Sequence, residues 1–463
     1  MHNRINTPTN NSLWTRFFLS FIICCTILAP GIVLSKNQPS LRIEDPLILL
    51  MVFYLLAKKK GGVNNVFFGR KTRPLAIPYL LLTFWILSVT LIVSIFSLSI
   101  GTLFSTIISS LSTMKAFLIA IVIINLSKDK ITVKTQFIIV IACLLIELFI
   151  VYAQANNFFD IHEWLSPLYR RDRRFNSAAS RIGGTYGNPN SAAVAIAAML
   201  SLVVSKFTFE VKPFHRIFLI IIIIFSFYSV VAFTGSRTGM LMCIIAISMP
   251  FLILMFLRKH RKKALILTIG IFVIQCSLPS ILNNSKWSKR YINFTNIESI
   301  DQSLEDPSFT ARVANWESIF NNMQNDILGG KGLLSRESWI VTDNGYVSVF
   351  LYGGLVGLCF YIWFLLYPAI IMLNHLFRLN STLPFFDIVL LSGGITCISI
   401  LIIASITVPI YANAKLNATF MIIIALSLNS IPSTKAMTAR GKPVVGDMTK
   451  LCTQARNKRI CHD

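Results

Sequence analysis

Five arginines lie close together in one segment, and their type and spacing suit a site for an anionic ligand: Arg170, Arg171, Arg173, Arg174 and Arg181. A guanidinium group stays charged, and its planar N–H donors match phosphate oxygens. The segment runs into Gly-Asn-Pro-Asn at 187–190, where Asn188 with Pro189 is typical of a helix start. A helix N-terminus is partially positive, so we predict a phosphate site that also includes Asn188 and Asn190. The alternative is an ordinary cap beside a flexible glycine turn.

A second motif, Thr-Gly-Ser-Arg at 234–237, interrupts an apolar stretch that runs from Ile217 to Leu257. That stretch is long enough for two membrane spans, and glycine permits the tight turn that must join them. Arg237, with Ser236 beside it, then lies at the mouth of a helix bundle, where a guanidinium can bind a diphosphate in a bidentate manner. The alternative is an arginine that extends to lipid headgroups.

A third motif, Asp343-Asn344-Gly345, ends a connection of about 60 residues, which is far longer than usual between helices. A carboxylate beside arginines stays ionised and can act as a base toward a sugar hydroxyl, so Asp343 is a candidate catalytic residue. Asp343 can also be the N-cap of the following helix.

The long connection is predicted to contain a helix that begins near Asp306, because apolar residues recur there at helical spacing. This helix either lies on the membrane or packs on the bundle. Both possibilities place Arg312 and Arg336 near the outer membrane surface.

Composition sets the framework for these motifs. The chain has 463 residues, of which 54% are hydrophobic and 13% charged, and its apolar runs repeatedly reach the roughly 20 residues that a spanning helix needs. We therefore predict an all-α, polytopic transmembrane helical bundle with about twelve spans. These lie near 16–35, 44–57, 75–98, 105–126, 135–155, 189–206, 215–234, 238–257, 264–282, 344–371, 386–408 and 411–429.

The basic residues determine the orientation of the spans in the membrane, because cytoplasmic loops are rich in Lys and Arg. Most of the 43 basic residues fall on one side when the N-terminus is cytoplasmic, so both termini are predicted to be cytoplasmic. The first apolar run is interpreted as a retained anchor. Lys115 and Glu147 lie at matching depths and are predicted to form a structural ion pair, with a relay as the alternative.

The predicted organisation has six parts. They are spans one to five in 1–155, a basic extracytoplasmic loop in 156–187, spans six to nine in 188–282, a large, partly helical extracytoplasmic loop in 283–343, spans ten to twelve in 344–429, and a disordered basic cytoplasmic tail in 430–463.

Several classes of function are excluded. The outer loops carry no Asp-x-Asp pair and no histidine cluster, so no metal site is expected. A phosphate-binding loop for ATP is also missing. The net charge of +24 reflects membrane topology and does not indicate nucleic acid.

The three motifs resemble those of the O-antigen ligase/polymerase family. The resemblance covers roughly 165–360 and rests on Gly-Asn-Pro-Asn, Thr-Gly-Ser-Arg, a Gly-Gly-Lys-Gly turn at 329–332, and Asn344 followed by Gly354 and Gly357. Ligases of this family usually carry a histidine before that asparagine, where this chain has Asp343. This difference favours a Wzy-type polymerase of O-antigen, capsule or exopolysaccharide repeat units.

The resemblance implies an inverting, metal-independent glycosyltransferase on the outer face of a bacterial inner membrane, with no cofactor. Its substrate would be an oligosaccharide linked to polyprenyl (undecaprenyl) diphosphate, and its partners the lipid bilayer, a flippase and a chain-length regulator. Arg181 and Arg237, with Arg312, would bind the diphosphate, and Asp343 would act on the acceptor hydroxyl. Arg173 and Arg174 would attract the lipid carrier by charge.

Two alternatives remain open from the sequence. A ligase or protein O-oligosaccharyltransferase of the same family would share the donor site and differ only in the acceptor. A transporter or flippase of lipid-linked sugars would need charges at several depths along a central cavity.

Overall fold

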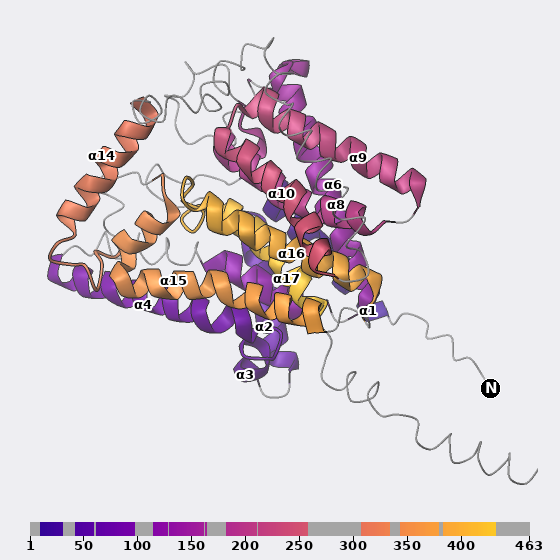
Figure 1. Ribbon diagram of the computed structural model, residues 1–463. Helices are drawn as coiled ribbons and strands as arrows, with labels where there is room; N and C mark the ends of the chain where they lie inside the picture. Colours follow the sequence, from indigo (N-terminus) through magenta and orange to yellow (C-terminus); the bar gives the residue numbers. More distant parts are fainter. Residues whose placement is uncertain are drawn as a thin grey trace, which may run out of the picture.

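The computed structural model shown in Figure 1 describes residues 10–30, 42–59, 62–97, 114–127, 129–161, 163, 182–210, 212–257, 307–333, 343–378 and 383–431. Within these ranges every regular element is helical. The longer helices are α1 (Asn10–Leu28), α2 (Glu44–Lys58), α3 (Gly62–Phe67), α4 (Arg73–Ser97), α6 (Lys130–Ala155), α8 (Pro189–Phe209), α9 (Pro213–Tyr228), α10 (Arg237–Phe256), α14 (Pro307–Asn322), α15 (Gly345–Arg378), α16 (Phe385–Ala404) and α17 (Ala414–Asn429). Three short turns of helix are η1 (Phe158–Asp160), η3 (Gly184–Tyr186) and η4 (Ser229–Thr234).

Seven helices within the described ranges are long and apolar enough to cross a membrane. They are Arg73–Phe96, Lys130–Ala155, Pro189–Phe209, Pro213–Thr234, Arg237–Phe256, Gly345–Arg378 and Phe385–Ala404. Shorter apolar helices occupy Leu13–Leu28, Met114–Leu126 and Ala414–Asn429. The chain is therefore an all-α, multi-pass membrane protein. The predicted span 264–282 lies outside the described residues, and the count of twelve stays a prediction.

Helix α8 lies at the centre of the bundle and packs against α10, α16, α17 and α6. It is buried almost throughout, and much of its surface is alanine. Small residues allow helices in a membrane to approach closely. Gly239 of α10 packs against Ala193, and a Cβ on Gly393 of α16 would lie 2.6 Å from the side chain of Leu202. The alanine-rich surface of α8 thus brings the neighbouring helices close together.

Helix α15 is broken at Gly354, where the chain folds back. Gly354 has a φ of 61° and a ψ of −159°, which are not helical values. The rings of Tyr346 and Tyr361 have centroids 5.7 Å apart, whereas a continuous helix would separate these residues by about 22 Å. We call the segment before Gly354 the first limb and the segment after it the second limb; both are orange in Figure 1. The membrane-crossing part of the predicted span 344–371 is therefore the second limb.

The Gly-Gly-Lys-Gly turn at 329–332 docks onto this break. The backbone N–H groups of Lys331 and Gly332 donate to carbonyl groups of the first limb, at 2.8 and 3.0 Å. Gly330 has a φ of +81°, and a Cβ there would lie 2.5 Å from the amide nitrogen of Gly354. Because only glycine permits this approach, the turn satisfies backbone groups that the break exposes.

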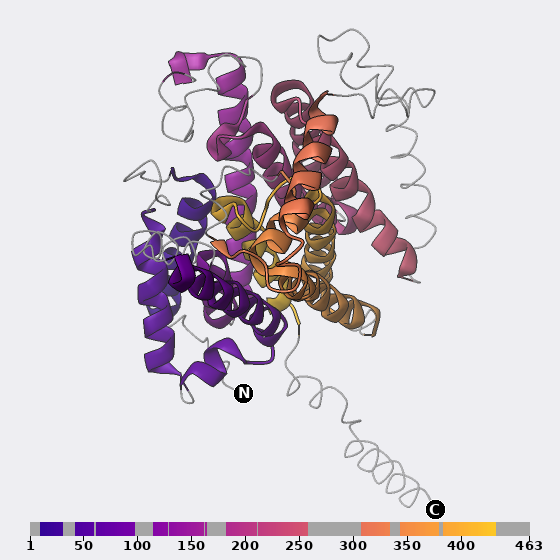
Figure 2. The ribbon, with the colours of Figure 1, turned by 90° about the vertical axis from the view of Figure 1, so that its left-hand side faces the viewer.

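Helix α14 lies across one end of the bundle, near the ends of α4 and α15, and faces the viewer in Figure 2. Its residue Ile319 is fully buried, and so is Met323, which follows the helix. Phe320 packs on Phe350 of the first limb with ring centroids 5.4 Å apart. Of the two predicted arrangements, a helix packed on the bundle is the one observed.

The predicted pair of Lys115 with Glu147 is wrong. Lys115 Nζ lies 2.6 Å from Glu44 Oε1 and 2.6 Å from Asp45 Oδ1, and Glu147 instead contacts Thr185. The first turn of α2 places two carboxylates beside Lys115. Glu44 is fully buried. Nothing in the sequence indicates this, because acidic residues at a helix start are usually exposed.

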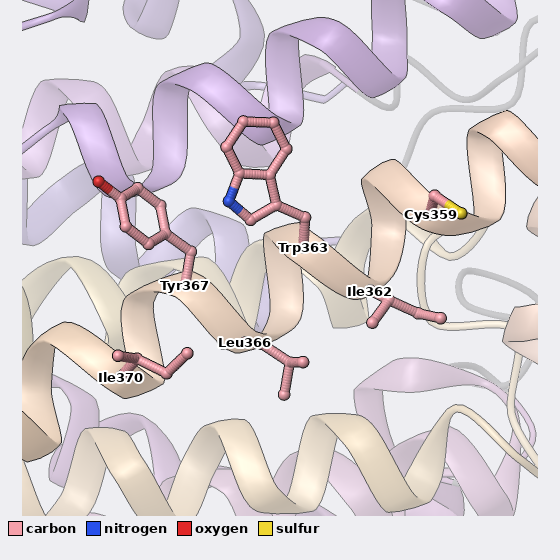
Figure 3. A pocket seen from close by; sticks show the side chains of 6 residues that line it. All are labelled: Cys359, Ile362, Trp363, Leu366, Tyr367 and Ile370. Atoms are coloured by element: carbon pink, nitrogen blue, oxygen red, sulfur yellow. The ribbon is translucent and has the colours of Figure 1, made fainter.

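An open apolar groove of about 420 Å³ runs along the second limb of α15. Figure 3 shows Trp363 and Tyr367 on one side of the helix and Ile362, Leu366 and Ile370 on the other. These residues, with Cys359, recur at helical spacing. Such a stripe is typical of a helix surface in contact with lipid, and it brings no charged side chain to the site described below.

Candidate functional site

Four helices begin at the same end of the bundle, and each has a polar side chain as its N-cap. Asn188 Oδ1 accepts from the backbone at the start of α8, and Ser236 Oγ does so for α10. Asn344 and Asn413 cap α15 and α17 in the same manner. Asparagine and serine are strongly preferred at this position because their side chains satisfy backbone N–H groups that lack a helical partner.

Hydrogen bonds between these N-termini hold them together. Ser236 Oγ donates to Asn190 Oδ1 over 2.9 Å, which joins α10 to α8. Asn413 Nδ2 donates to Ser191 Oγ over 3.2 Å, which joins α17 to α8. The backbone N–H of Gly345 donates to Ser405 O, in the connection from α16 to α17, at 2.6 Å. The positive ends of four helix dipoles therefore converge on one region.

Arg237 is the first residue of α10 and is exposed. The chain reaches it through the π-helical turn η4 and through Gly235, whose φ of +56° permits the reversal between α9 and α10. The cap formed by Ser236 then sets the direction in which α10 begins. The predicted short connection between two apolar segments is thus present, with Arg237 at its tip.

Arg312 and Asp343 form an ion pair between α14 and the start of α15. Arg312 Nε lies 3.5 Å from Asp343 Oδ2, and the side chain of Asp343 is 51% exposed. Asp343 is not the N-cap of α15, because Asn344 accepts the backbone N–H groups of that helix. The carboxylate of Asp343 is therefore not used in capping and remains accessible from solvent.

Several predicted site residues lie outside the described residues: Arg170, Arg171, Arg173, Arg174, Arg181 and Arg336. The described chain resumes at Ile182, whose backbone N–H donates to Phe233 O over 3.1 Å. Phe233 belongs to η4, directly before the Thr-Gly-Ser-Arg motif. Ile182, the first described residue after the arginine segment, is therefore tied to the turn that leads to Arg237.

Some residues of this region were not predicted as part of a site. Asn413 and Ser191 complete the contact between α17 and α8, and Lys415 lies buried in the first turn of α17. Asn413 before an apolar run is typical of a helix start, just as Asn188 is. That pattern could have revealed the cap, although not its partner on another helix.

Among the residues that the structure describes, no group of three or more His, Cys, Asp or Glu side chains is placed to hold a metal ion. Charged groups described near the helix N-termini include Arg237, Arg312 and Asp343, together with the buried pair of Lys415 and Glu147 beside Thr185. An arrangement of guanidinium groups, helix N-termini and one accessible carboxylate can bind a phosphate-containing ligand and accept a proton.

Part of the chain matches a known protein family. Residues 220–362 match the family described as O-antigen ligase, whereas no curated protein matches the chain. The matched segment contains Thr-Gly-Ser-Arg at 234–237, the turn at 329–332, and Asn344 with the two glycines of α15 that follow it. Gly-Asn-Pro-Asn precedes the segment and contacts it through the hydrogen bond that Ser236 donates to Asn190. The match over 220–362 supports an assignment of the chain to the O-antigen ligase/polymerase family.

Proposed function

We propose that this protein is a membrane glycosyltransferase that joins oligosaccharide repeat units carried on polyprenyl diphosphate into O-antigen, capsule or exopolysaccharide. The observation that carries the proposal is the convergence of four capped helix N-termini with Arg237 and the Arg312–Asp343 pair, within a chain of the O-antigen ligase/polymerase family. The site would face the outer side of a bacterial inner membrane, with both chain termini on the cytoplasmic side.

The diphosphate is the part of the substrate that this end of the bundle suits. Two phosphate groups match guanidinium forks, and helix N-termini favour negative charge. Arg237 and Arg181 would hold the diphosphate, with Arg312 nearby and with Arg173, Arg174 and Arg336 adding positive charge. The caps Asn188, Ser236 and Asn344 support the helix ends, together with Asn190, which accepts a hydrogen bond from Ser236.

The transfer would be a direct displacement. The acceptor hydroxyl oxygen attacks the anomeric carbon of the donor sugar, and the bond from that carbon to the diphosphate oxygen breaks. The electron pair of that bond goes to the diphosphate, where arginines stabilise the added charge. The hydroxyl proton passes to the carboxylate of Asp343. One displacement inverts the configuration at the anomeric carbon and needs no metal ion.

The position of Asp343 suits it to this role. Its carboxylate lies 3.5 Å from Arg312 Nε at the start of α15, and a carboxylate is a common general base. The half-exposed side chain leaves room for an acceptor. Helix α14, which lies across this end of the bundle, would cover the glycan and limit access of water.

A ligase that transfers a finished glycan to another acceptor is the second candidate. Asp343 directly before Asn344, in place of the histidine usual in ligases, favours the polymerase. A transporter is disfavoured because the buried charges described within the helices are engaged with specific partners, as in the pair of Lys115 with Glu44.

Purified protein in lipid nanodiscs, supplied with a synthetic lipid-linked repeat unit and a metal chelator, tests the proposal. A ladder of products on a gel would support a metal-independent polymerase. A single transfer to an added lipid or protein acceptor, without a ladder, would support the ligase. No product with any acceptor, together with movement of the labelled lipid across vesicles, would establish a transporter instead.

A further inference from the structure

A buried cluster of contacts surrounds Thr185, in the turn just before α8. Glu147 of α6 accepts two hydrogen bonds from Thr185, from its backbone N–H at 3.0 Å and from its hydroxyl at 2.6 Å. Lys415 of α17 donates to the carbonyl oxygen of Thr185 at 2.9 Å. All three polar groups of Thr185 therefore contact a charged side chain.

These charges lie deep in the protein. Glu147 is 0% exposed, Thr185 is 1% exposed and Lys415 is 5% exposed. Removing a charge from water is unfavourable, and apolar side chains of similar size often stabilise a fold as well or better. Stability alone therefore gives little reason for a carboxylate and an ammonium on either side of one threonine. Together they define the position of Thr185 closely, because each bond has a required direction.

The same turn is held by a second set of contacts. The hydroxyl of Tyr186 lies 2.8 Å from that of Thr419 on α17, and Lys415 Nζ lies 4.8 Å from the centre of the Tyr186 ring. Gly184 has a φ of +53°, and a Cβ there would overlap the carboxylate of Glu147. The turn thus fits closely between α6 and α17.

This turn connects two parts of the candidate site. Before it, Ile182 follows Arg181 and bonds η4. After it, Asn188 caps α8, and Asn190 accepts the bond from Ser236 next to Arg237. Any shift of Thr185 would therefore move Asn188 and Asn190 relative to Ser236 and η4.

We propose that Glu147 and Lys415 are positioning residues, which hold Thr185 between them and so fix the turn 183–188 that places the anion-binding groups. The effect on catalysis rests on the proposed function, whereas the holding of the turn does not. The pair acts through Thr185 and does not touch the substrate.

Hydrogen–deuterium exchange of the protein in nanodiscs tests the holding of the turn. Thr185→Val removes the hydroxyl with little change of shape, whereas Thr185→Ser keeps it. We expect Thr185→Val to speed exchange in the peptide that covers 182–190 by about tenfold, as the loss of a bond to a charged group implies. Glu147→Gln, which removes the charge, should act in the same direction. Thr185→Ser should resemble the original protein.

A matched control is Thr396→Val, which removes a buried hydroxyl that bonds only its own helix, α16, at 2.9 Å. It should leave exchange in 182–190 unchanged. Equal exchange in Thr185→Val and the original protein would overturn the proposal. Faster exchange of 182–190 in the control would overturn it as well.

The kinetic test uses the synthetic lipid-linked repeat unit. A variant that only folds less well contains less active enzyme, so its kcat falls while its KM is unchanged. Displaced anion-binding groups should instead raise KM, by about tenfold in Thr185→Val and by less than twofold in Thr185→Ser. Faster exchange with an unchanged KM would overturn the positioning of the site. If the unsubstituted protein makes no product, only the proposed function is overturned, because the exchange measurements do not depend on activity.

Discussion

Asn190 and Ser236 are joined by a hydrogen bond of 2.9 Å, although they come from different motifs and different helices. Ser236 Oγ donates its proton to Asn190 and at the same time accepts from the backbone N–H of Gly239. One hydroxyl thus caps α10 and ties it to α8. The polar residues of both motifs support the helix ends, and the adjacent Arg237 is exposed.

Arg237→Lys is expected to abolish polymer formation while single lipid-linked repeat units accumulate. Lysine keeps the charge but cannot bind a diphosphate through two parallel N–H donors, and we expect a loss of about 100-fold in kcat/KM. Product ladders from nanodisc reactions measure the effect. Arg378→Lys, an exposed change at the last residue of α15, is the control and should be neutral. Normal polymer length in Arg237→Lys at a normal protein level would refute the role of Arg237.

Gly330→Ala is expected to destabilise the protein, whereas Gly329→Ala should be tolerated. Gly330 has a positive φ and lies against the break of α15, while a Cβ on Gly329 meets no atom within 4 Å. The strained backbone alone costs at least about 1 to 2 kcal/mol, and the overlap adds to this. Thermal unfolding in detergent compares the two variants. Equal melting temperatures would show that the turn at 329–332 does not dock as described.

The elements of the fold were largely predictable because a membrane leaves few choices. Each spanning segment must satisfy its own backbone groups, so apolar runs such as the one that forms α6 indicate helices directly. Helix starts were also readable, since Asn188 with Pro189 has a local pattern and the cap is observed. These signals depend only on neighbouring residues, so they can be recognised from the sequence alone.

Contacts between distant segments could not be derived in this way. Gly354 reverses the chain because the turn at 329–332 supplies hydrogen bonds there, and nothing near Gly354 in the sequence indicates that partner. Lys115 was predicted to pair with Glu147 because their depths in the membrane match, and hydropathy did not reveal that Glu44 is buried. Asn413 has a recognisable cap pattern, but its bond to Ser191 depends on the packing of α17 against α8.

Cys24 and Cys143 are expected to form a disulfide when membranes are treated with copper phenanthroline. Their sulfur atoms lie 3.9 Å apart between α1 and α6, and side-chain rotation with small helix motion can bring them to the bond length of about 2.05 Å. Mass spectrometry of digested protein identifies the linked peptides, and Cys143→Ser should remove the link. Cys25 is an internal control, since consecutive helical residues point about 100° apart. A link between Cys25 and Cys143 would contradict the packing of α1 on α6.

Asp343→Asn is expected to lower kcat by about 100-fold or more with little change in protein level. The amide keeps the shape of the side chain but accepts no proton, and Asn344 rather than Asp343 caps α15, so the helix start should be preserved. Because the pair with Arg312 is partly exposed, its loss should alter stability by less than about 1 kcal/mol. Asp326→Asn, an exposed change in the segment after α14, is the control. Full activity of Asp343→Asn would rule out Asp343 as the base and leave it only the ion pair between α14 and α15.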